Sequence, residues 1–170
     1  QYRRSIEFME KAIAVDSGFA VAYANMGVAY GNLGKKEEQR KYLQEALRLS
    51  DRLPEREKLR IQGSAFQSQF STYDQAVATF EKIVSLYPDS AEALPAHVNL
   101  GNLYTRFEEW DKAIAHYEAA IGTGQVTAQV FEGRPLPYMA KGEYQKAKEV
   151  LEEGAKRFPD RPRAHWRLGM

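Results

Sequence analysis

The feature that most constrains the fold is a helical unit that recurs at a nearly constant spacing along the chain. Its clearest copy is the stretch LPAHVNLGNLYTRFEEWDKAIAHYEAAI, from Leu94 to Ile121. Successive copies of the unit's central position lie 37, 37, 34 and 34 residues apart. That position is occupied in turn by Gly27, Ser64, Gly101, Pro135 and Gly169. Such a period is typical of stacked units that are each too small to bury an apolar face alone.

Each unit has the pattern of two amphipathic helices joined by a polar turn. In the clearest copy, apolar residues recur at helical spacing on both sides of the turn at Glu108 and Glu109. The small residues Gly101, Ala113 and Ala120 fall where the two helices would touch, which favours close packing of a helical hairpin. We therefore predict an all-α fold built from antiparallel helical hairpins.

The unit resembles the tetratricopeptide repeat (TPR), whose period of about 34 residues carries the signature W-x2-L-G-x2-Y, A-x3-F and P. Residues that match parts of this signature are Leu100, Gly101, Tyr104, Ala76, Phe80 and Pro88. The resemblance extends over nearly the full chain. It implies a right-handed α-α superhelix, a TPR solenoid, in which the first helices of the repeats line a concave groove.

The repeat pattern predicts a single array over residues 1–170. The expected segments are 1–17, the second helix of a partial repeat; 20–53, 54–88, 89–122 and 125–159, four complete repeats; and 162–170, the start of a further repeat. Because both ends fall inside repeats, we expect a fragment of a longer protein, with apolar surface exposed at the ends of the array.

Glycine and proline residues predict where helices stop or bend. Gly34 is placed to end a helix, and Pro54 to begin one. Pro95 is expected in a first helical turn or at a kink. Pro135 and Pro137 each remove a backbone donor and disfavour the α conformation of the preceding residue, so we expect a kink or break between residues 133 and 137.

Composition excludes several classes of function. The 24 Lys and Arg residues nearly balance the 23 Asp and Glu residues, so we expect neither nucleic-acid binding nor a membrane-surface patch. No apolar run approaches the roughly 18 residues that a membrane span needs, so we expect no membrane insertion. The chain has no cysteine, which fits a reducing compartment, and we expect a cytoplasmic protein.

The three histidines are the residues to weigh for catalysis or metal binding. His97 and His165 lie 68 residues apart, twice the repeat period, which favours rings packed between helices. His116 has no His or Asp three or four residues away that would form a helical ligand pair. We therefore expect no enzymatic activity, no metal site and no cofactor.

The resemblance implies a binding face made by the first helix of each repeat. Its groove positions are Val21, Ala24, Val28 and Asn32, then Lys58, Ile61, Ala65 and Gln69, then Val98, Asn102 and Arg106, and finally Gln129, Glu132 and Leu136. Asn102 and Arg106 are the best candidates for hydrogen bonds to the backbone or carboxylate of a bound peptide. The implied function is a non-catalytic scaffold that binds a partner peptide or helix in the groove.

A TPR subtype that binds chaperones clamps a terminal carboxylate with five lysine, asparagine and arginine side chains. Asn102, Arg163 and Arg167 occupy three of those positions, but Val98 and Gly133 occupy the other two, which argues against a clamp.

Two alternative functions stay open. The stretch SDRLPEREKLRIQG, with the hairpin that follows it up to Pro88, resembles the TPR tails of bacterial Ser/Thr kinases and related signalling regulators, which would make the chain a regulatory tail of such a protein. Exposed array ends would instead favour a self-associating structural array.

Overall fold

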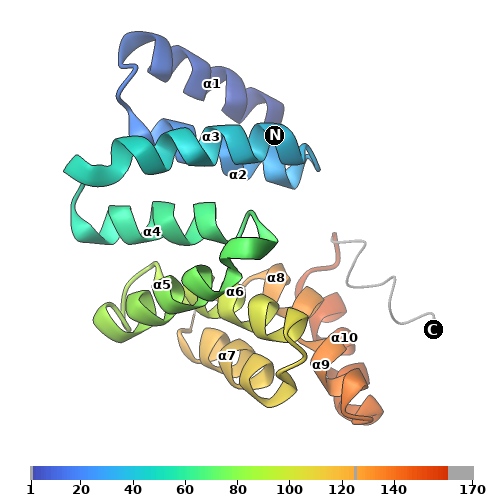
Figure 1. Cartoon of the computed structure of the whole chain (residues 1–170). Coiled ribbons are helices and arrows are strands. Elements are labelled where there is room, and N and C mark those ends of the chain that lie inside the picture. Colours follow the sequence, from blue (N-terminus) through green and yellow to red (C-terminus); the bar gives the residue numbers. More distant parts are fainter. Residues whose placement is uncertain (1, 125, 161–170) are drawn as a thin grey trace. The chain divides into compact units, whose positions relative to one another are not determined.

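The computed structural model describes residues 2–124 and 126–160, and all regular structure in these ranges is helical (Figure 1). The helices are α1 (Tyr2–Val15), α2 (Ala20–Asn32), α3 (Lys36–Leu49), α4 (Glu55–Phe66), α5 (Tyr73–Leu86), α6 (Ala93–Arg106), α7 (Trp110–Gly122), α8 (Ala128–Gly133), α9 (Pro135–Ala140) and α10 (Tyr144–Arg157). Two short 3-10 helices, Ser50–Arg52 and Phe70–Thr72, precede α4 and α5. The predicted all-α fold of helical hairpins is confirmed. None of the described helices is long and apolar enough to cross a membrane.

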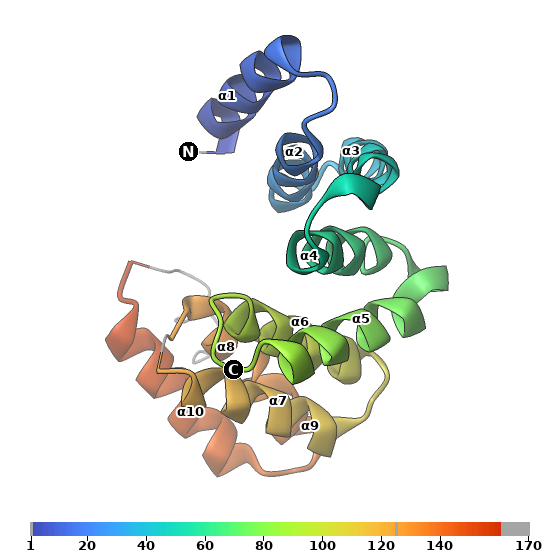
Figure 2. The ribbon, with the colours of Figure 1, turned by 90° about the vertical axis from the view of Figure 1, so that its left-hand side faces the viewer.

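Backbone contacts divide the chain into two compact units, residues 1–83 and 84–170, and the boundary falls within α5. In the first unit, α2 pairs with α3 and lies between α1 and α4 (Figures 1 and 2). Both faces of α2 are therefore apolar. Met26 and Ala29 pack with Ile6 of α1, and Ala20 and Ala24 pack with Ala46 and Ile61 of α3 and α4.

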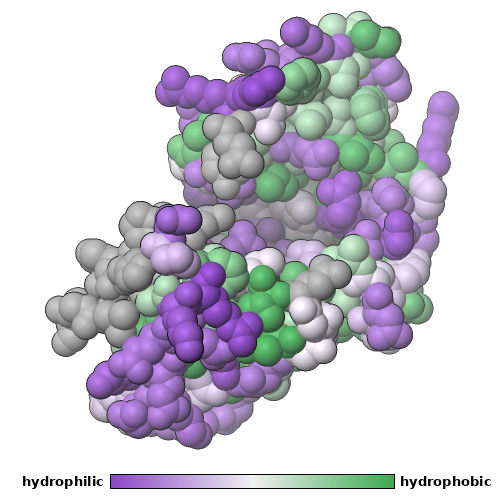
Figure 3. Space-filling view, turned by 180° about the vertical axis from the view of Figure 1, so that it is seen from behind, coloured by the Kyte–Doolittle hydropathy of each residue, from purple (hydrophilic) through white to green (hydrophobic). Residues whose placement is uncertain are grey.

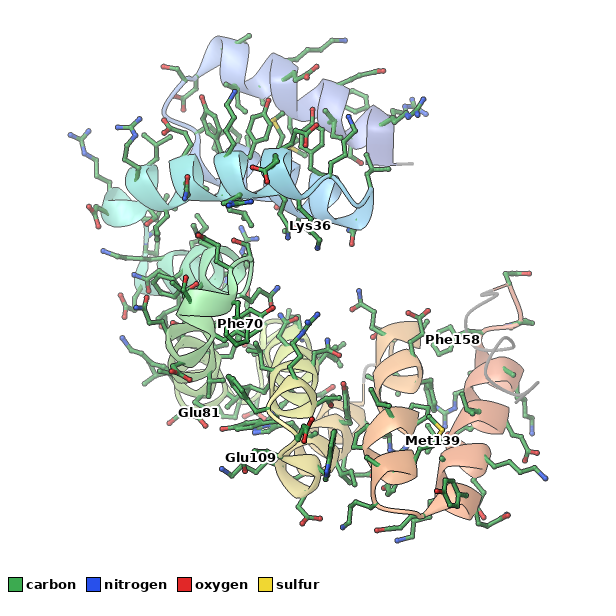
Figure 4. The ribbon with its side chains drawn as sticks, turned by 45° about the vertical axis from the view of Figure 1, so that its right-hand side comes forward. Lys36, Phe70, Glu81, Glu109, Met139 and Phe158 are labelled. Carbon is green, nitrogen blue, oxygen red and sulfur yellow. The ribbon has the colours of Figure 1, made fainter. Side chains whose placement is uncertain are left out.

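The second unit contains the α6–α7 hairpin and the α8–α9–α10 segment. Buried side chains from α8, α9 and α10 form one of its cores, made of Phe131, Tyr138, Ala147 and Val150. Met139 and Phe158, both labelled in Figure 4, pack against this core. The core holds α10 against the two short helices that precede it.

Glycine allows the two helices of a hairpin to approach closely. A Cβ atom added to Gly27 would lie 2.6 Å from Leu43 Cγ, and one added to Gly101 would lie 2.7 Å from Tyr117 Cε1. In the second hairpin the close contact is made by Gly63, whose added Cβ would lie 2.5 Å from Phe80 Cε1. The repeat spacing predicted Ser64, not Gly63, at the position equivalent to Gly27 and Gly101. The predicted register of α4 is therefore wrong by one residue at this contact.

The proline-rich stretch interrupts the first helix of the last hairpin, as predicted. The helix is divided at Arg134 into α8 and α9, and Pro135 is the first residue of α9. Arg134 nevertheless keeps the right-handed helical conformation, with φ −59° and ψ −32°. The following proline disfavours this conformation but does not abolish it. Pro135 is in the first turn of α9, where its missing N–H needs no partner.

Two further backbone expectations are confirmed. Pro95 is the third residue of α6, in the first turn, where helical N–H groups have no partner within the helix. Gly34 follows the end of α2 with φ 76°. The same left-handed conformation recurs after α6 at Glu108, with φ 60°, and after α9 at Gly142, with φ 76°. Pro54 lies one residue before the first residue of α4.

Candidate functional site

Four of the predicted groove residues are buried and pack between helices. Their exposed fractions are 1% for Ala24, 0% for Ile61, 5% for Ala65 and 3% for Val98. Ala24 and Ile61 share a cluster that joins α2 to α4. The face assigned from the resemblance therefore includes positions at which neighbouring first helices cover each other, as Ala24 and Ile61 do. All four side chains have almost no surface to offer a partner.

The remaining groove positions keep solvent-accessible side chains. Those that are exposed are Val28, Asn32, Asn102, Arg106, Gln129 and Leu136, and those that are partly buried are Val21, Lys58, Gln69 and Glu132. Lys58 is engaged with Asp51 at 2.7 Å. The hydrogen bond from Lys58 to Asp51 raises the pKa of Lys58, and the same bond lowers the pKa of Asp51. Whether these positions bind a peptide stays a prediction.

Asn102 is held in one orientation by its own hairpin. The Tyr117 hydroxyl of α7 donates a hydrogen bond to Asn102 Oδ1 at 2.8 Å. The Tyr117 ring is fully buried, and it has this place because Gly101 leaves room for it. With Oδ1 occupied, the exposed Asn102 side chain presents its amide NH2 group as a hydrogen-bond donor.

A polar brace joins α7 to the interrupted helix α8–α9. The Arg134 guanidinium forms an ion pair with the Glu118 carboxylate, and the Tyr138 hydroxyl donates to Glu118 Oε1 at 3.1 Å. The Arg134 guanidinium also lies over the Tyr138 ring, 5.7 Å from its centroid. The carboxylate-clamp candidates Arg163 and Arg167 lie outside the described residues, as does the expected segment 162–170.

Sequence reasoning missed a cavity between α1 and α3, which we call the α1–α3 slot. It has a volume of about 770 Å³. Its lining residues are Glu10, Ile13 and Ala14 of α1, Tyr23 and Met26 of α2, and Lys41, Tyr42, Gln44, Glu45 and Arg48 of α3. The one available signal was the pair Tyr23 and Tyr42, two large aromatic residues whose ring centroids the α2–α3 hairpin brings to within 6.3 Å of each other.

Sequence reasoning also missed a histidine pair in the second unit. The Nδ1 atoms of His97 and His116 lie 3.0 Å apart, at hydrogen-bonding distance, and the His116 ring stacks on Tyr104. Burial lowers the pKa of His97, which favours its neutral form. The two histidines are on different helices, so no helical spacing could have paired them. Among the described residues, no three His, Asp or Glu side chains are placed to hold a metal ion.

Exposed apolar side chains are scattered over the described surface. On the face seen in Figure 3, hydrophobic residues form small patches interrupted by hydrophilic ones. The most exposed aromatic side chains are Phe70 at 82% and Tyr144 at 70%. Phe70, labelled in Figure 4, contacts the edge of the Tyr73 ring. Isolated residues of this kind are normal for a folded surface.

Comparison with known proteins gives a consistent family. Models described as "Tetratricopeptide repeat" match residues 20–52, 61–90, 96–125 and 138–170. No curated protein matches the sequence.

Solved structures share the fold at low sequence identity. TTC0263, a thermophilic TPR protein of Thermus thermophilus, is 15% identical, with a TM-score of 0.77 over 99% of this chain and 89% of its own. YrrB, a TPR protein with an unusual peptide-binding site, is 21% identical, with a TM-score of 0.63 over 99% and 84%. MamA of Desulfovibrio magneticus is 23% identical, with a TM-score of 0.61 over 88% and 81%.

Proposed function

The chain belongs to the tetratricopeptide repeat family, and on that premise we propose that it is a non-catalytic scaffold that binds a polypeptide segment of a partner protein. The proposed contact surface is the exposed part of the first helices. Stacked helical hairpins present such surfaces repeatedly, and repeat proteins use them for extended recognition. The similarity to YrrB, described as having a peptide-binding site, supports the same class of ligand.

The observation that carries the proposal is the fixed orientation of Asn102. Its amide is on a rigid helix, its Oδ1 atom is occupied by the Tyr117 hydroxyl at 2.8 Å, and its side chain is exposed. A bound peptide must find donors for its backbone carbonyl groups, and an amide NH2 held in place loses little entropy when it supplies one. Arg106 is exposed four residues further along α6, on the same side of the helix.

A peptide-display selection tests the proposal without knowledge of the natural partner. Random peptides of about 12 residues are selected on the immobilised chain, and the affinities of the selected peptides are measured by fluorescence anisotropy. Asn102→Ala removes one hydrogen bond, so affinity is expected to fall about fivefold, which corresponds to about 1 kcal/mol. Tyr117→Phe keeps the ring and frees the Asn102 amide, and a smaller loss of affinity is expected.

Gln75→Ala is the matched control. Gln75 is also an exposed amide residue on a helix, but it belongs to α5, a second helix of a hairpin. Affinity for the selected peptides should stay within about twofold of that of the unchanged chain. If no peptide is selected, or if Gln75→Ala weakens binding as much as Asn102→Ala does, the first helices are not the binding surface.

A further inference from the structure

None of the residues that line the α1–α3 slot is a predicted groove position, and nothing in the proposed function uses the slot. We propose that it is a second docking site, which receives a two-turn amphipathic helix of a partner protein. Three helices of the first unit build it: α1 and α3 form its walls, and Tyr23 and Met26 of α2 form its floor.

The length of the slot fits two helical turns. On α3, the lining residues extend from Lys41 to Arg48, which is about 10 Å along a helix axis. Lys41, Glu45 and Arg48 stand at positions i, i+4 and i+7, so they form one row on that helix. On α1, Glu10 and Ala14 form a row at i and i+4. Rows of this kind are the ridges between which another helix packs.

The centre of the slot is apolar and partly rigid. Tyr42 is stacked on Tyr30 with ring centroids 5.2 Å apart and an interplanar angle of 6°, which holds the Tyr42 ring in place. Met26 lies beneath it and is itself buried. The accessible apolar surface of the slot therefore comes from the half-buried side chains of Ile13, Tyr23 and Tyr42. Ala14 of α1 is small and exposed, so it allows a close approach. A volume of about 770 Å³ is large enough for several apolar side chains.

The lining charges sum to opposite signs on the two walls, negative on α1 from Glu10 and positive on α3, where Glu45 is offset by Arg48. Lys41 of α3 and Glu10 of α1 both line the slot. The Lys41 ammonium lies over the Tyr42 ring, 5.8 Å from its centroid, and within the described part of the chain no ion pair to a carboxylate is found for it. Arg48, by contrast, is paired with Glu45 at 2.5 Å. An occupant that satisfies both walls carries an acid on one flank and a base on the other, with an apolar stripe between them. An amphipathic helix has this arrangement, and it is recognised through apolar anchors at i, i+4 and i+7.

Two synthetic helical peptides of about 14 residues serve as probes. Both carry leucine at positions i, i+4 and i+7. One has glutamate along one flank and lysine along the other, and the second has lysine along both. Binding of the labelled peptides to the full chain is measured by fluorescence anisotropy. The mixed-flank peptide is expected to bind the unchanged chain more tightly, by up to about fivefold, because only it satisfies both Lys41 and Glu10.

Three variants decide the outcome. Ala14→Arg fills the slot from an exposed position and should weaken both peptides about tenfold or more. Lys41→Glu makes both walls acidic and should reverse the preference in favour of the lysine-flanked peptide. Lys11→Glu makes the same charge change on α1, at an exposed residue outside the lining, and should leave the preference unchanged. Far-ultraviolet circular dichroism checks that each variant keeps its helix content.

Several results would overturn the proposal. It fails if neither peptide binds, if Ala14→Arg has no effect, or if Lys11→Glu changes the preference as much as Lys41→Glu does. The fluorescent dye anilinonaphthalene sulfonate provides a further arm. Displacement of the bound dye by the mixed-flank peptide supports a helix as occupant. If Ala14→Arg abolishes dye binding but a saturating concentration of peptide does not reduce it, the slot is a small-molecule cavity instead.

Discussion

The α2–α3 hairpin of the first unit and the α6–α7 hairpin of the second place three ring side chains at corresponding repeat positions. The spacings along the chain are 7 and 12 residues in both hairpins. The two sets are Tyr23, Tyr30 and Tyr42 in the first hairpin and His97, Tyr104 and His116 in the second. One set contains only tyrosine, and the other places histidine at two of the three positions.

The relative ring orientations are nearly the same in the two sets, although the centroids of the tilted pair are 6.3 Å apart in the α2–α3 hairpin and 5.3 Å apart in the α6–α7 hairpin. The stacked pair has a centroid distance of 5.2 Å in the α2–α3 hairpin and 5.4 Å in the α6–α7 hairpin, with an interplanar angle of 6° in both. The tilted pair has interplanar angles of 33° and 36°. The backbone of the repeat therefore sets how the rings lie, whichever residues supply them.

What differs is the chemistry that the rings add. In the α2–α3 hairpin, Tyr23 and Tyr42 line the α1–α3 slot. In the α6–α7 hairpin, the two histidines form a hydrogen bond that depends on their protonation. The same two repeat positions thus line a cavity in one hairpin and form a titratable contact in the other.

The largest expected effect tests the shared backbone. Gly27 and Gly101 occupy the same repeat position, and alanine at either should destabilise the chain by about 2–3 kcal/mol, because the new methyl group meets Leu43 or the fixed Tyr117 ring. Gly31→Ala is the control within α2. The atoms nearest to its added Cβ belong to the Gln39 side chain, which can move, so a cost below about 1 kcal/mol or a gain is expected. The urea unfolding midpoints of the three variants show whether the loss of stability is specific to the repeat position of Gly27 and Gly101 or follows from replacing any glycine in a helix.

The turns of the two hairpins give a second comparison. The left-handed residue after the first helix is Gly34 in one and Glu108 in the other, with φ 76° and 60°. A side chain in this conformation costs about 1 kcal/mol, so Glu108→Gly should raise stability by roughly that amount, and Gly34→Ala should lower it. Glu109→Gly is the control, because Glu109 has φ −86° and gains nothing from glycine. Equal effects of the two glutamate substitutions on the melting temperature would contradict this explanation.

Much of the fold followed from local sequence signals, for local reasons. Helical periodicity identified the hairpins, Gly34 identified a helix end, and Pro135 identified the break at Arg134. Each of these signals acts on the backbone within one or two helical turns of the residue that carries it.

The candidate sites were less predictable because they depend on contacts between helices. Ile61 was assigned to the groove, but side chains of α2 cover it. The sequence of α4 alone does not indicate that α2 packs on this face. The one-residue shift from Ser64 to Gly63 depends on how Phe80 is seated. The His97–His116 pair required knowing that residues 19 positions apart share one hairpin interface.

The histidine pair predicts a pH dependence that the tyrosine set lacks. Burial lowers the pKa of His97 below its ordinary value of 6.5, so the unfolded chain takes up a proton first as the pH falls. The stability contributed by the neutral pair is present above pH 6.5 and is lost as the pH falls through the folded-state pKa. Losing one hydrogen bond is worth about 1 kcal/mol, or roughly 2–4 °C in melting temperature for a chain of this size.

Exchange of the rings between the hairpins isolates this effect from the titration of carboxylates. The double variant His97→Tyr and His116→Tyr should show a smaller fall in melting temperature between about pH 7.5 and pH 5 than the unchanged chain. The reverse exchange, Tyr23→His with Tyr42→His, should enlarge the fall. If the fall in melting temperature between these pH values is the same in both double variants as in the unchanged chain, the His97–His116 pair does not control the pH dependence of stability.

The smallest expected effect concerns an ion pair whose charges are inverted between the hairpins. Lys35 pairs with Glu38 at the start of α3, whereas Glu109, labelled in Figure 4, pairs with Lys112 at the start of α7. In both hairpins the lysine ammonium lies over the tyrosine of the stacked pair, 5.5 Å from the Tyr30 centroid and 5.3 Å from the Tyr104 centroid.

Exchanging the charges in α3 should therefore keep the pair and the ring contact. The double variant Lys35→Glu with Glu38→Lys moves an acid from the first turn of α3 to its N-cap and a base from the N-cap to the first turn, so a change of no more than about 0.3 kcal/mol is expected. Lys35→Glu alone loses both contacts and leaves two acids together, so stability should fall by about 0.5–1 kcal/mol. The difference in urea midpoint between each variant and the unchanged chain should shrink at about 1 M salt, because exposed charges are screened there. If the double variant is no more stable than the single one, the lysine does not reach the tyrosine from its new position, and the ring geometry alone is what the two hairpins share.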